Sequence, residues 1–299
     1  MTRIASTAIR KAVIPAAGLG TRMLPITKAI PKEMFPLANR PIIQYAVEEA
    51  AASGIEEVIL VTRAGKSVLE TYFASAPALE LSLHQQGGGG ELELLRTLSA
   101  RVRISAVYQS SPRGLGDALR CAQSTIGNEP FAVILPDALV VAQKPVLAQL
   151  MAAYQYCPGS FVATQRVEES DVCKFGMLAV EPLENTFTSA KIFQVSALIE
   201  KPSVKDSPSL YGIFGRYLLQ PEIFNFLNSA SADPNGEIQL TDCLAQYCQT
   251  EPLYALCFEG THYDTGDKVG YLRASVDFAL RDPEVCNAVH KYLTTLNLS

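Results

Sequence analysis

The stretch KAVIPAAGLGTR, residues 11–22, constrains the fold of this chain more than any other segment. Ala12 to Ala17 form a nearly continuous apolar run, typical of a strand in a sheet covered on both faces, and the run stops at Gly18 and Gly20. A strand that ends in a glycine turn places backbone N–H groups at the carboxyl edge of an open α/β sheet, where such sheets bind their ligands. We therefore expect an α/β fold whose first loop binds an anion.

Three cations, Arg22, Lys28 and Lys32, follow the glycines within one loop. A guanidinium can make two parallel hydrogen bonds to phosphate oxygens, and a lysine adds a point charge, so the loop suits a polyphosphate better than a single carboxylate. The spacing lacks the third glycine of a dinucleotide-binding motif and the G-K-[ST] ending of a Walker loop. A dehydrogenase is therefore disfavoured, and a nucleoside triphosphate is favoured.

Apolar strands alternate with helical stretches through the first half of the chain, which predicts a doubly wound, mostly parallel sheet. The strands are expected at 11–17, 57–62, 104–109 and 131–136, and the helices at 41–53, 67–73 and 117–126. After about Pro158 the runs SFVATQR, FGMLAVE, KIFQVSALIEKP and YGIFGRYLL predict antiparallel or mixed strands that extend the same sheet.

The last third is expected to hold helices at 221–228 and 238–248 and a strand at 253–258. Residues 269–296 have helical apolar spacing and could cap the core or meet another subunit. Gly87–Gly90 is expected to be a flexible loop tip. We predict a single domain over residues 1–299, with 268–299 as a helical tail.

Composition excludes several classes of function. The formal net charge of -5 gives no basic field for a polynucleotide, so no nucleic-acid partner is expected. The longest apolar runs are far shorter than the roughly 20 residues needed to cross a bilayer, so no membrane span is predicted. The seven cysteines include no C-x-x-C pair, which fits a reducing compartment. We expect a cytoplasmic protein.

Two aspartates follow predicted strands. Asp137 ends the segment FAVILPD, so its carboxylate is expected at the same sheet edge as the Gly18 loop, and Asp264 lies in YDTGD after the strand at 253–258. Reactions at a phosphate group need its negative charge neutralised, and two carboxylates that converge with phosphate oxygens suit octahedral Mg²⁺. The pair is therefore a candidate Mg²⁺ site.

Several motifs occur in one order along nearly the whole chain. They are GLGTR at 18–22, PKEMFP at 31–36, GLG at 114–116, EKP at 200–202, GRY at 215–217, GEIQLTD at 236–242 and YDTGDK at 263–268. In this set the chain resembles the nucleotidyltransferases that make nucleoside diphosphate sugars, and most closely their uridylyl branch. The resemblance implies a Rossmann-like mixed sheet of the nucleotide-diphospho-sugar transferase type.

The resemblance also implies an activity, in which UTP and glucose 1-phosphate give UDP-glucose and pyrophosphate by Mg²⁺-assisted in-line attack on the α-phosphate. Arg22 and Lys32 would bind the triphosphate, Lys201 would orient glucose 1-phosphate, and Asp137 and Asp264 would hold Mg²⁺. Members of the family often form dimers or tetramers, so a homo-oligomer is expected.

Binding roles carry over to further residues. The nucleotide would be bound by Ala16, Ala17, Gly18, Gly20, Gln109 and Gly114. The sugar would be bound by Gly176, Glu200 and Lys201. The amide of Gln109 can offer both a donor and an acceptor to a uracil edge, and Gly176 would let backbone approach the hexose closely.

The chain departs from the family pattern at three positions, one of which is the conservative change of the commoner YDCGDK to YDTGDK. Asp117 stands where the uridylyl branch usually has histidine, and Ala138 follows the metal aspartate where many members have a different residue, often an acid. A new carboxylate near the base could change the nucleotide preference or lower activity. Two alternatives therefore stay open, namely the same chemistry with dTTP or another sugar 1-phosphate, and a low-activity regulatory paralogue that binds nucleotide sugar.

Overall fold

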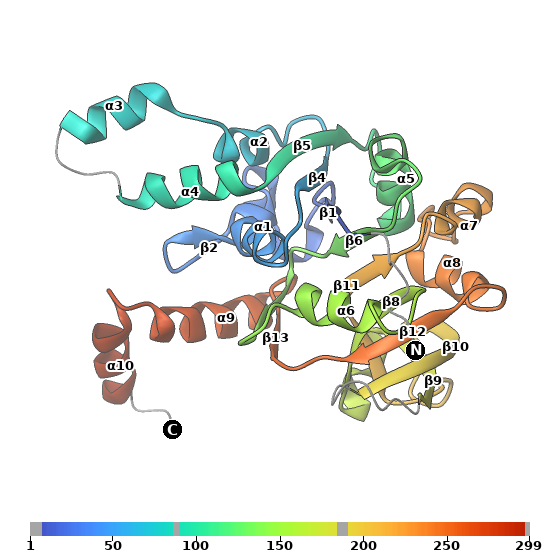
Figure 1. The fold of residues 1–299 in the computed structure, drawn as a ribbon. Helices are drawn as coiled ribbons and strands as arrows, with labels where there is room; N and C mark the ends of the chain where they lie inside the picture. The colour runs from blue at the N-terminus through green and yellow to red at the C-terminus, as the bar shows by residue number, and fades with distance from the viewer. Residues whose placement is uncertain (1–7, 86–89, 184–190, 297–299) are drawn as a thin grey trace.

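A nine-stranded sheet forms the centre of the computed structural model, which describes residues 8–85, 90–183 and 191–296 (Figure 1). Its strands are β1 (Lys11–Pro15), β4 (Glu57–Thr62), β5 (Arg103–Tyr108), β6 (Phe131–Ile134), β8 (Ser160–Arg166), β9 (Gly176–Pro182), β10 (Lys191–Glu200), β11 (Tyr211–Leu219) and β12 (Leu253–Cys257). Their order across the sheet is β5-β4-β1-β6-β11-β8-β12-β10-β9. The strands expected from the sequence are confirmed, with ends that differ by one or two residues.

The sheet changes character at β11. The first four strands are parallel, because β1 pairs with β4 and β6 and β4 pairs with β5 in that sense. From β11 on the pairing is mixed, since β11 is antiparallel to β6 and β8, β12 is parallel to β8, and β10 is antiparallel to β12 and β9. The mixed, doubly wound sheet predicted from the sequence is confirmed.

Helices cover both faces of this sheet. They are α1 (Ile42–Ala52), α2 (Val68–Phe73), α3 (Pro77–Gln85), α4 (Gly90–Arg101), α5 (Gly114–Ile126), α6 (Val146–Tyr154), α7 (Ile223–Ser229), α8 (Leu240–Tyr247), α9 (Lys268–Arg281) and α10 (Cys286–Thr295). Ala12 and Ile14 of β1 pack in one core with α1 and α6, whereas Val13 packs in a second core with α5, α7 and α8. This alternation explains why the strand reads as continuously apolar.

Two short ribbons lie beside the sheet. One pairs β7 (Ala138–Val141) with β13 (Thr261–Asp264), and the other pairs β2 (Pro36–Leu37) with β3 (Arg40–Pro41). Together with α9 they enclose a third, smaller core that includes Phe35, Leu139 and Tyr263. The β7–β13 ribbon matters for the site, because its register sets Asp264 opposite Ala138, next to Asp137.

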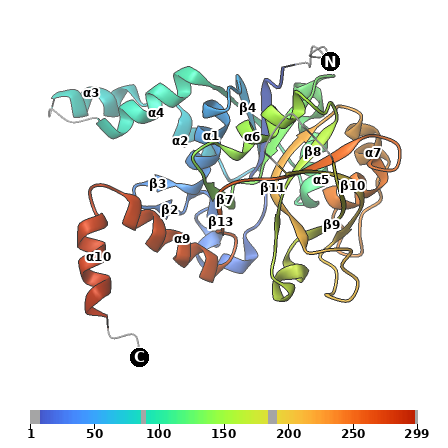
Figure 2. The same ribbon diagram turned by 60° about the horizontal axis from the view of Figure 1, so that its bottom comes forward.

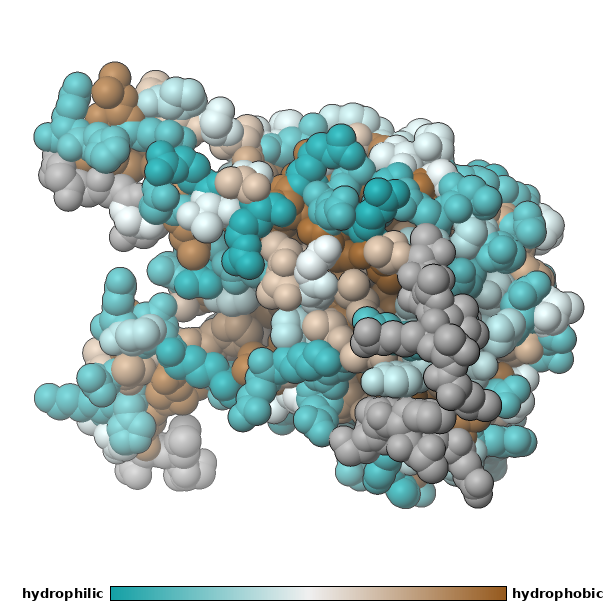
Figure 3. Space-filling view, in the orientation of Figure 1, coloured by the Kyte–Doolittle hydropathy of each residue, from teal (hydrophilic) through white to brown (hydrophobic). Residues whose placement is uncertain are grey.

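Two helical pairs project from the body of the molecule. Figures 1 and 2 show α3 with α4, and α10 beyond α9, on the same side, and Figure 3 shows an open hollow between them. The tail forms two helices rather than one because Pro283 cannot continue α9 and disfavours a helical Asp282 before it. Although its apolar spacing suggested a covered face, α10 buries none of its residues.

Some segments were not anticipated. Helices α3, α4 and α6 and both ribbons were absent from the sequence-based expectations. Of the glycine run Gly87–Gly90, residues 87–89 lie outside the described part of the chain, and Gly90 begins α4. Among residues 8–85, 90–183 and 191–296, no helix is both long and apolar enough to cross a bilayer.

Candidate active site

Two adjoining cavities lie where the loops after the parallel strands meet the antiparallel half of the sheet. The loop cavity, of about 370 Å³, is lined by residues that include Ala17, Gly18, Gly20, Gln109 and Gly114. The strand cavity, of about 620 Å³, is lined by residues that include Arg22, Gly176, Glu200, Lys201 and Asp264. Lys32 and Asp137 line both cavities. Each volume is in the range of small-molecule sites.

The glycine-rich loop follows β1 as expected. Gly20 has a positive φ of 67°, and a Cβ there would lie 2.9 Å from Thr27 Cγ2, so the turn requires glycine. The Thr27 hydroxyl also donates to Gly20 O (2.9 Å). Ala16 does not line either cavity but lies beneath the loop, where its N–H donates to Val61 O (2.7 Å).

A buried lysine supports this loop from below. Lys66 Nζ donates to Ala16 O (2.6 Å) and to Glu33 Oε2 (3.0 Å), and both charged side chains are almost fully buried. Burial lowers the pKa of Lys66, and the charge of Glu33 offsets part of that effect. The pair joins the end of β1 to the segment that carries Lys32. Sequence reasoning missed Lys66, because a lone lysine after a turn reads as a surface residue.

Lys32 and Asp137 form a hydrogen-bonded ion pair between the cavities. Burial alone would raise the pKa of Asp137, but the charge and hydrogen bond of Lys32, together with Arg22, outweigh it and hold that pKa below its ordinary value. The same pairing outweighs burial at Lys32 and raises the pKa of its ammonium. Both groups are thus charged at neutral pH at the point where the cavities meet.

Arg22, Asp137 and Asp264 converge around Gly266. A Cβ placed on Gly266 would lie 2.8 Å from Arg22 Nη2, 2.9 Å from Asp264 Oδ1 and 3.1 Å from Asp137 Oδ2. The two carboxylate oxygens therefore lie within about 6 Å of each other. Gly266 was not among the expected site residues, although the motif YDTGDK contained it.

Backbone contacts hold this cluster together. Thr265 donates to Asp137 O from both its N–H (2.8 Å) and its hydroxyl (3.0 Å), and Gly266 N donates to Asp264 Oδ1 (2.8 Å). Burial raises the pKa of Asp264 and the nearby charge of Asp137 adds to this, while the Gly266 N–H opposes it. Two close carboxylates of this kind are stabilised by a cation.

The described residues contain no cluster of three or more His, Cys, Asp or Glu side chains suited to a metal ion. Mg²⁺, however, commonly takes only one or two carboxylates from the protein and completes its shell with water and substrate phosphates. The oxygen-only donors and spacing of Asp137 and Asp264 fit that mode of binding. Ala138, which follows Asp137, lines the strand cavity and adds no ligand.

Gln109 also lines the loop cavity and is only 4% exposed. Its Nε2 donates to Asp117 Oδ2 (2.8 Å) and to Gly114 O (3.3 Å). Gly114 has a φ of +87°, and a Cβ there would lie 2.8 Å from Ile238 O, so glycine is required for this loop to pack on Ile238. Asp117 thus directly contacts the expected base-reading side chain.

The expected sugar-binding residues meet at the end of β10. Strand pairing places Glu200 opposite Gly176, where a Cβ would lie 3.2 Å from Glu200 Oε2. Thr241, which the sequence did not single out as a site residue, donates its hydroxyl proton to Glu200 Oε2 (2.6 Å). Lys201 has a positive φ of 42°, its ammonium lies 3.1 Å from Glu200 Oε1, and its side chain is 58% exposed.

His262 adds an uncharged polar group to the strand cavity. Its ring lies edge-on to Phe214, with 4.7 Å between ring centroids. Burial and, to a smaller extent, the charge of Arg216 lower the pKa of His262 to about 4, so the imidazole is neutral at pH 7. It can therefore donate and accept one hydrogen bond each.

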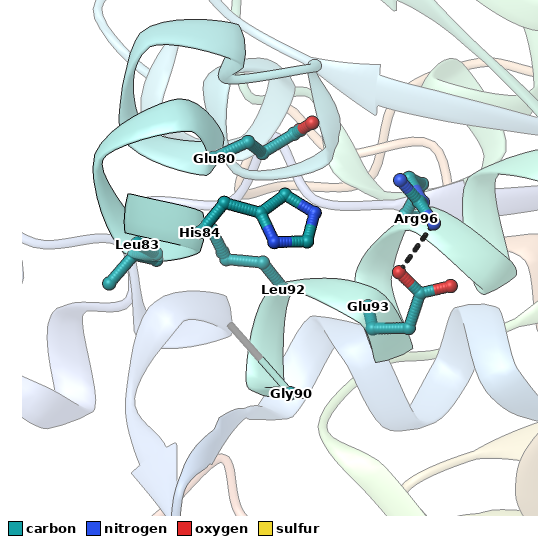
Figure 4. Close-up of a pocket in the computed structure, with 7 residues that line it drawn as sticks. All are labelled: Glu80, Leu83, His84, Gly90, Leu92, Glu93 and Arg96. Atoms are coloured by element: carbon teal, nitrogen blue, oxygen red, sulfur yellow. Dashed lines mark ion pairs between the residues drawn. The ribbon is translucent and has the colours of Figure 1, made fainter. Parts of the chain in front are cut away.

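A further pocket lies between α3 and α4 (Figure 4). His84 points between the two helices, and Arg96 forms an ion pair with Glu93 (2.6 Å) on α4. Both partners of that ion pair are more than half exposed, and the pocket is built by one projecting hairpin away from the sheet edge. It has no part in the cluster of Arg22, Asp137 and Asp264.

The chain is similar to curated bacterial enzymes over nearly its full length. It is 42% identical over 277 residues to a UTP–glucose-1-phosphate uridylyltransferase of Bacillus subtilis (strain 168), covering 93% of each chain. It is 41% identical over 285 residues to the UTP–glucose-1-phosphate uridylyltransferase YngB of the same organism, covering 95% of this chain and 94% of that one.

Solved structures agree with these relatives. A UDP-glucose pyrophosphorylase in complex with UDP-glucose superposes with a TM-score of 0.83 at 38% identity, covering 92% of this chain and all of the other. A UTP-bound UGPase from Acinetobacter baumannii superposes with a TM-score of 0.85 at 34% identity, covering 98% and 100%. The family model described as nucleotidyl transferase matches residues 11–280. The chain therefore belongs to the nucleotidyl transferase family.

Proposed function

We propose that this protein catalyses the reaction of UTP with glucose 1-phosphate to give UDP-glucose and pyrophosphate. The observation that carries the proposal is the convergence of Arg22, Asp137 and Asp264 at the junction of two cavities. A reaction that joins two anionic substrates needs a subsite for each of them. It also needs charged groups between the subsites that offset the repulsion between the two anions. The uridylyltransferase names of the relatives support the choice of substrates.

The loop cavity is the proposed nucleotide site. Backbone N–H groups of the loop from Ala17 to Gly20 would face the phosphates, because the N–H of Ala16 is already bonded to Val61 O. Lys32, together with Arg22 from the adjoining strand cavity, would bind the β- and γ-phosphates that leave as pyrophosphate. Gln109 and the backbone at Gly114 would bind the uracil edge. The exposed cation Lys28, the third of the loop, has no assigned role.

The strand cavity is the proposed sugar site. Glu200, oriented by the Thr241 hydroxyl, would accept hydrogen bonds from sugar hydroxyls, and the lack of a side chain at Gly176 leaves room for this Glu200–Thr241 pair at the wall of the cavity. Lys201 would orient the sugar phosphate, with little cost of desolvation because its side chain is largely exposed. The neutral His262 offers one more hydrogen-bonding group to the sugar.

Asp137 and Asp264 would hold Mg²⁺ together with phosphate oxygens. When bound, the ion would neutralise charge on the α-phosphate. Lys32, which is paired with Asp137 in this structure, would then be free to contact the triphosphate. The oxygen-only donor set and the spacing of the two carboxylates support Mg²⁺ over zinc, which prefers nitrogen and sulfur ligands.

The reaction requires little general acid–base catalysis from the protein. Glucose 1-phosphate is already an anionic nucleophile, so catalysis rests on holding its oxygen in line with the α-phosphorus and the leaving pyrophosphate while cations balance the developing charge. Arg22 and Lys32 act at the leaving group, and Lys201 acts on the nucleophile. We place this activity in a single domain of residues 1–299; assembly into a homo-oligomer remains a prediction from the family resemblance.

The test is a coupled pyrophosphate-release assay with UTP, dTTP, ATP and GTP, each with glucose 1-phosphate and with other sugar 1-phosphates. The proposal expects the highest kcat/KM for UTP with glucose 1-phosphate, and activity that is lost on chelation and restored by Mg²⁺. A preference for dTTP or for another sugar 1-phosphate would change the assigned substrates but leave the assigned type of reaction unchanged. Binding of UDP-glucose without turnover of any pair would instead identify a regulatory paralogue.

A further inference from the structure

The contact between Asp117 and Gln109 has a consequence for base selection. Gln109 Nε2 lies 2.8 Å from Asp117 Oδ2. A side-chain amide can in principle present either its N–H₂ or its carbonyl oxygen to a neighbour, but an ionised carboxylate only accepts hydrogen bonds. The amide of Gln109 can therefore turn only its nitrogen toward Asp117.

The second N–H of the same amide also has a partner. Gly114 O lies 3.3 Å from Gln109 Nε2, and the Gly114 loop is tied to Ile238 by hydrogen bonds from Gly116 N to Ile238 O and from Ile238 N to Arg113 O (2.8 Å each). Both protons of the amide nitrogen thus point at fixed acceptors. The nitrogen has no proton left for a ligand.

The oxygen atom of the Gln109 amide remains available to a ligand in the loop cavity. Gln109 Oε1 accepts no hydrogen bond from the described parts of the chain. It is also not one of the fully buried side-chain atoms there that lack a partner, which are Thr62 Oγ1 and Arg63 Nε, so some of its surface is accessible. Oε1 therefore keeps access to the loop cavity, which Gln109 lines. A base that docks there meets a hydrogen-bond acceptor whose orientation is set before binding.

We propose that Asp117 is a positioning residue that sets base selection by holding Gln109 Oε1 toward the nucleotide. Uracil and thymine carry a ring N3–H that can donate to Oε1, whereas cytosine presents a lone pair at N3 and would place two acceptors face to face. Asp117 therefore selects bases with a ring N–H and rejects cytosine. This inference rests on the proposed function, which places the nucleotide in the loop cavity.

The test compares UTP with CTP in the purified full-length protein and in Asp117→Asn. Parental protein is expected to favour UTP over CTP in kcat/KM by about 100-fold, or about 2.7 kcal/mol, because binding CTP leaves a hydrogen bond unmade and a buried acceptor unpaired. An asparagine can offer either its oxygen to Gln109 Nε2 or its nitrogen to Oε1, so both orientations of Gln109 become populated. The UTP:CTP ratio is expected to fall at least about tenfold.

The ratio of the dissociation constants of UDP and CDP, measured by calorimetry, tests the same base selection without turnover. A general structural defect would weaken both nucleotides alike and leave the ratio unchanged, and that outcome in a folded variant overturns the proposal. If Asp117→Asn does not fold, Asp117→Ala serves, because it leaves the amide of Gln109 without its main acceptor. A protein that distinguishes UDP from CDP but never releases pyrophosphate would refute the proposed function and keep this inference.

Arg120→Gln is the matched control. Arg120 Nη1 lies 3.9 Å from Asp117 Oδ1, so this variant changes the charge next to Asp117 and keeps the hydrogen bond between Asp117 and Gln109. Its UTP:CTP ratio is expected to stay within about twofold of the parental value. A tenfold fall in this control would show that charge, rather than the orientation of the amide, sets the preference, and would also overturn the proposal.

Discussion

The loop cavity and the strand cavity meet at Lys32 and Asp137, but they hold their polar groups in different ways. On the loop side, Lys66 and Glu33 form a buried pair and Gln109 is fixed by Asp117. On the strand side, Lys201 extends a largely exposed ammonium from the end of β10. The nucleotide half of the cleft is therefore organised before any ligand binds, whereas the sugar half keeps its cation in solvent.

This difference has energetic consequences. Removing one member of a desolvated ion pair leaves an uncompensated buried charge and typically costs 3–5 kcal/mol, whereas exposed pairs contribute roughly 0–1 kcal/mol. We therefore expect substitutions on the loop side to affect both folding and catalysis. Substitutions on the strand side should affect the binding of one substrate alone. The following four predictions test that division.

The largest effect is expected for Asp137→Asn, at the boundary of the two halves. The change removes a carboxylate that pairs with Lys32 and faces Asp264, so both the charge balance and the proposed Mg²⁺ ligand are lost. We expect kcat to fall at least about 10³-fold, or about 4 kcal/mol in the barrier. A steady-state assay over a Mg²⁺ titration measures this, and the titration should shift to higher Mg²⁺.

Asp206→Asn is the control, because Asp206 is exposed and its side chain accepts a hydrogen bond from the nearby Ser203 hydroxyl, away from both cavities. It should retain parental kinetics. An Asp137→Asn protein whose metal titration overlays that of the parent would contradict a ligand role for Asp137.

Lys66→Met is expected to produce the second-largest effect, and on stability. It leaves Glu33 buried without its cation and removes the donor to Ala16 O, so we expect a loss of about 3 kcal/mol in the free energy of unfolding. Urea unfolding measures the loss. The double variant Lys66→Met/Glu33→Gln should recover about half of it, since no uncompensated charge remains. If the single variant is as stable as the parent, the loop side is not anchored by this pair.

Gly266→Ala comes third and acts on geometry alone. The added methyl group would collide with the ends of three flexible side chains, Arg22, Asp137 and Asp264, and these can move aside without unfolding the chain. We expect kcat/KM to fall about 100-fold, or about 2.7 kcal/mol, with a melting temperature close to the parental value. Gly90→Ala is the control, because a Cβ there would meet none of the residues that the structure describes within 4 Å. A fully active Gly266→Ala protein would show that the cluster tolerates displacement.

Gly266 also shows where prediction from the sequence ends. The strand, the glycine turn and the cations Arg22 and Lys32 are contiguous, so local pattern was enough to place them at one edge of the sheet. The importance of Gly266 depends on the meeting of residues 22, 137 and 264, which are far apart in the chain. A motif can mark such a glycine as part of a segment, but only the folded backbone shows what its missing side chain makes room for.

Lys66 and Asp117 illustrate the same limit for charged residues. Lys66 directly precedes one expected helix and Asp117 begins another, and the usual expectation for an ionisable residue at such a position is solvent exposure. Their partners are Glu33 and Gln109. The sequence identified Asp117 as a departure from the family pattern. How Asp117 orients the amide of Gln109 could be inferred only from the geometry of the folded chain.

The smallest effect is expected for Lys201→Met, on the strand side. Its exposed ammonium would contribute one charge-assisted contact to the sugar phosphate, so we expect KM for glucose 1-phosphate to rise about tenfold, or about 1.4 kcal/mol, while KM for UTP and the free energy of unfolding stay nearly unchanged. Substrate-saturation kinetics for each substrate, with Lys205→Met as an exposed control, separate these quantities. A parallel rise in both KM values, or a loss of stability comparable to that of Lys66→Met, would mean that the two halves of the cleft are organised alike. The largely exposed Lys201 is paired with Glu200, which also lines the sugar side, so its loss should not reach the nucleotide side.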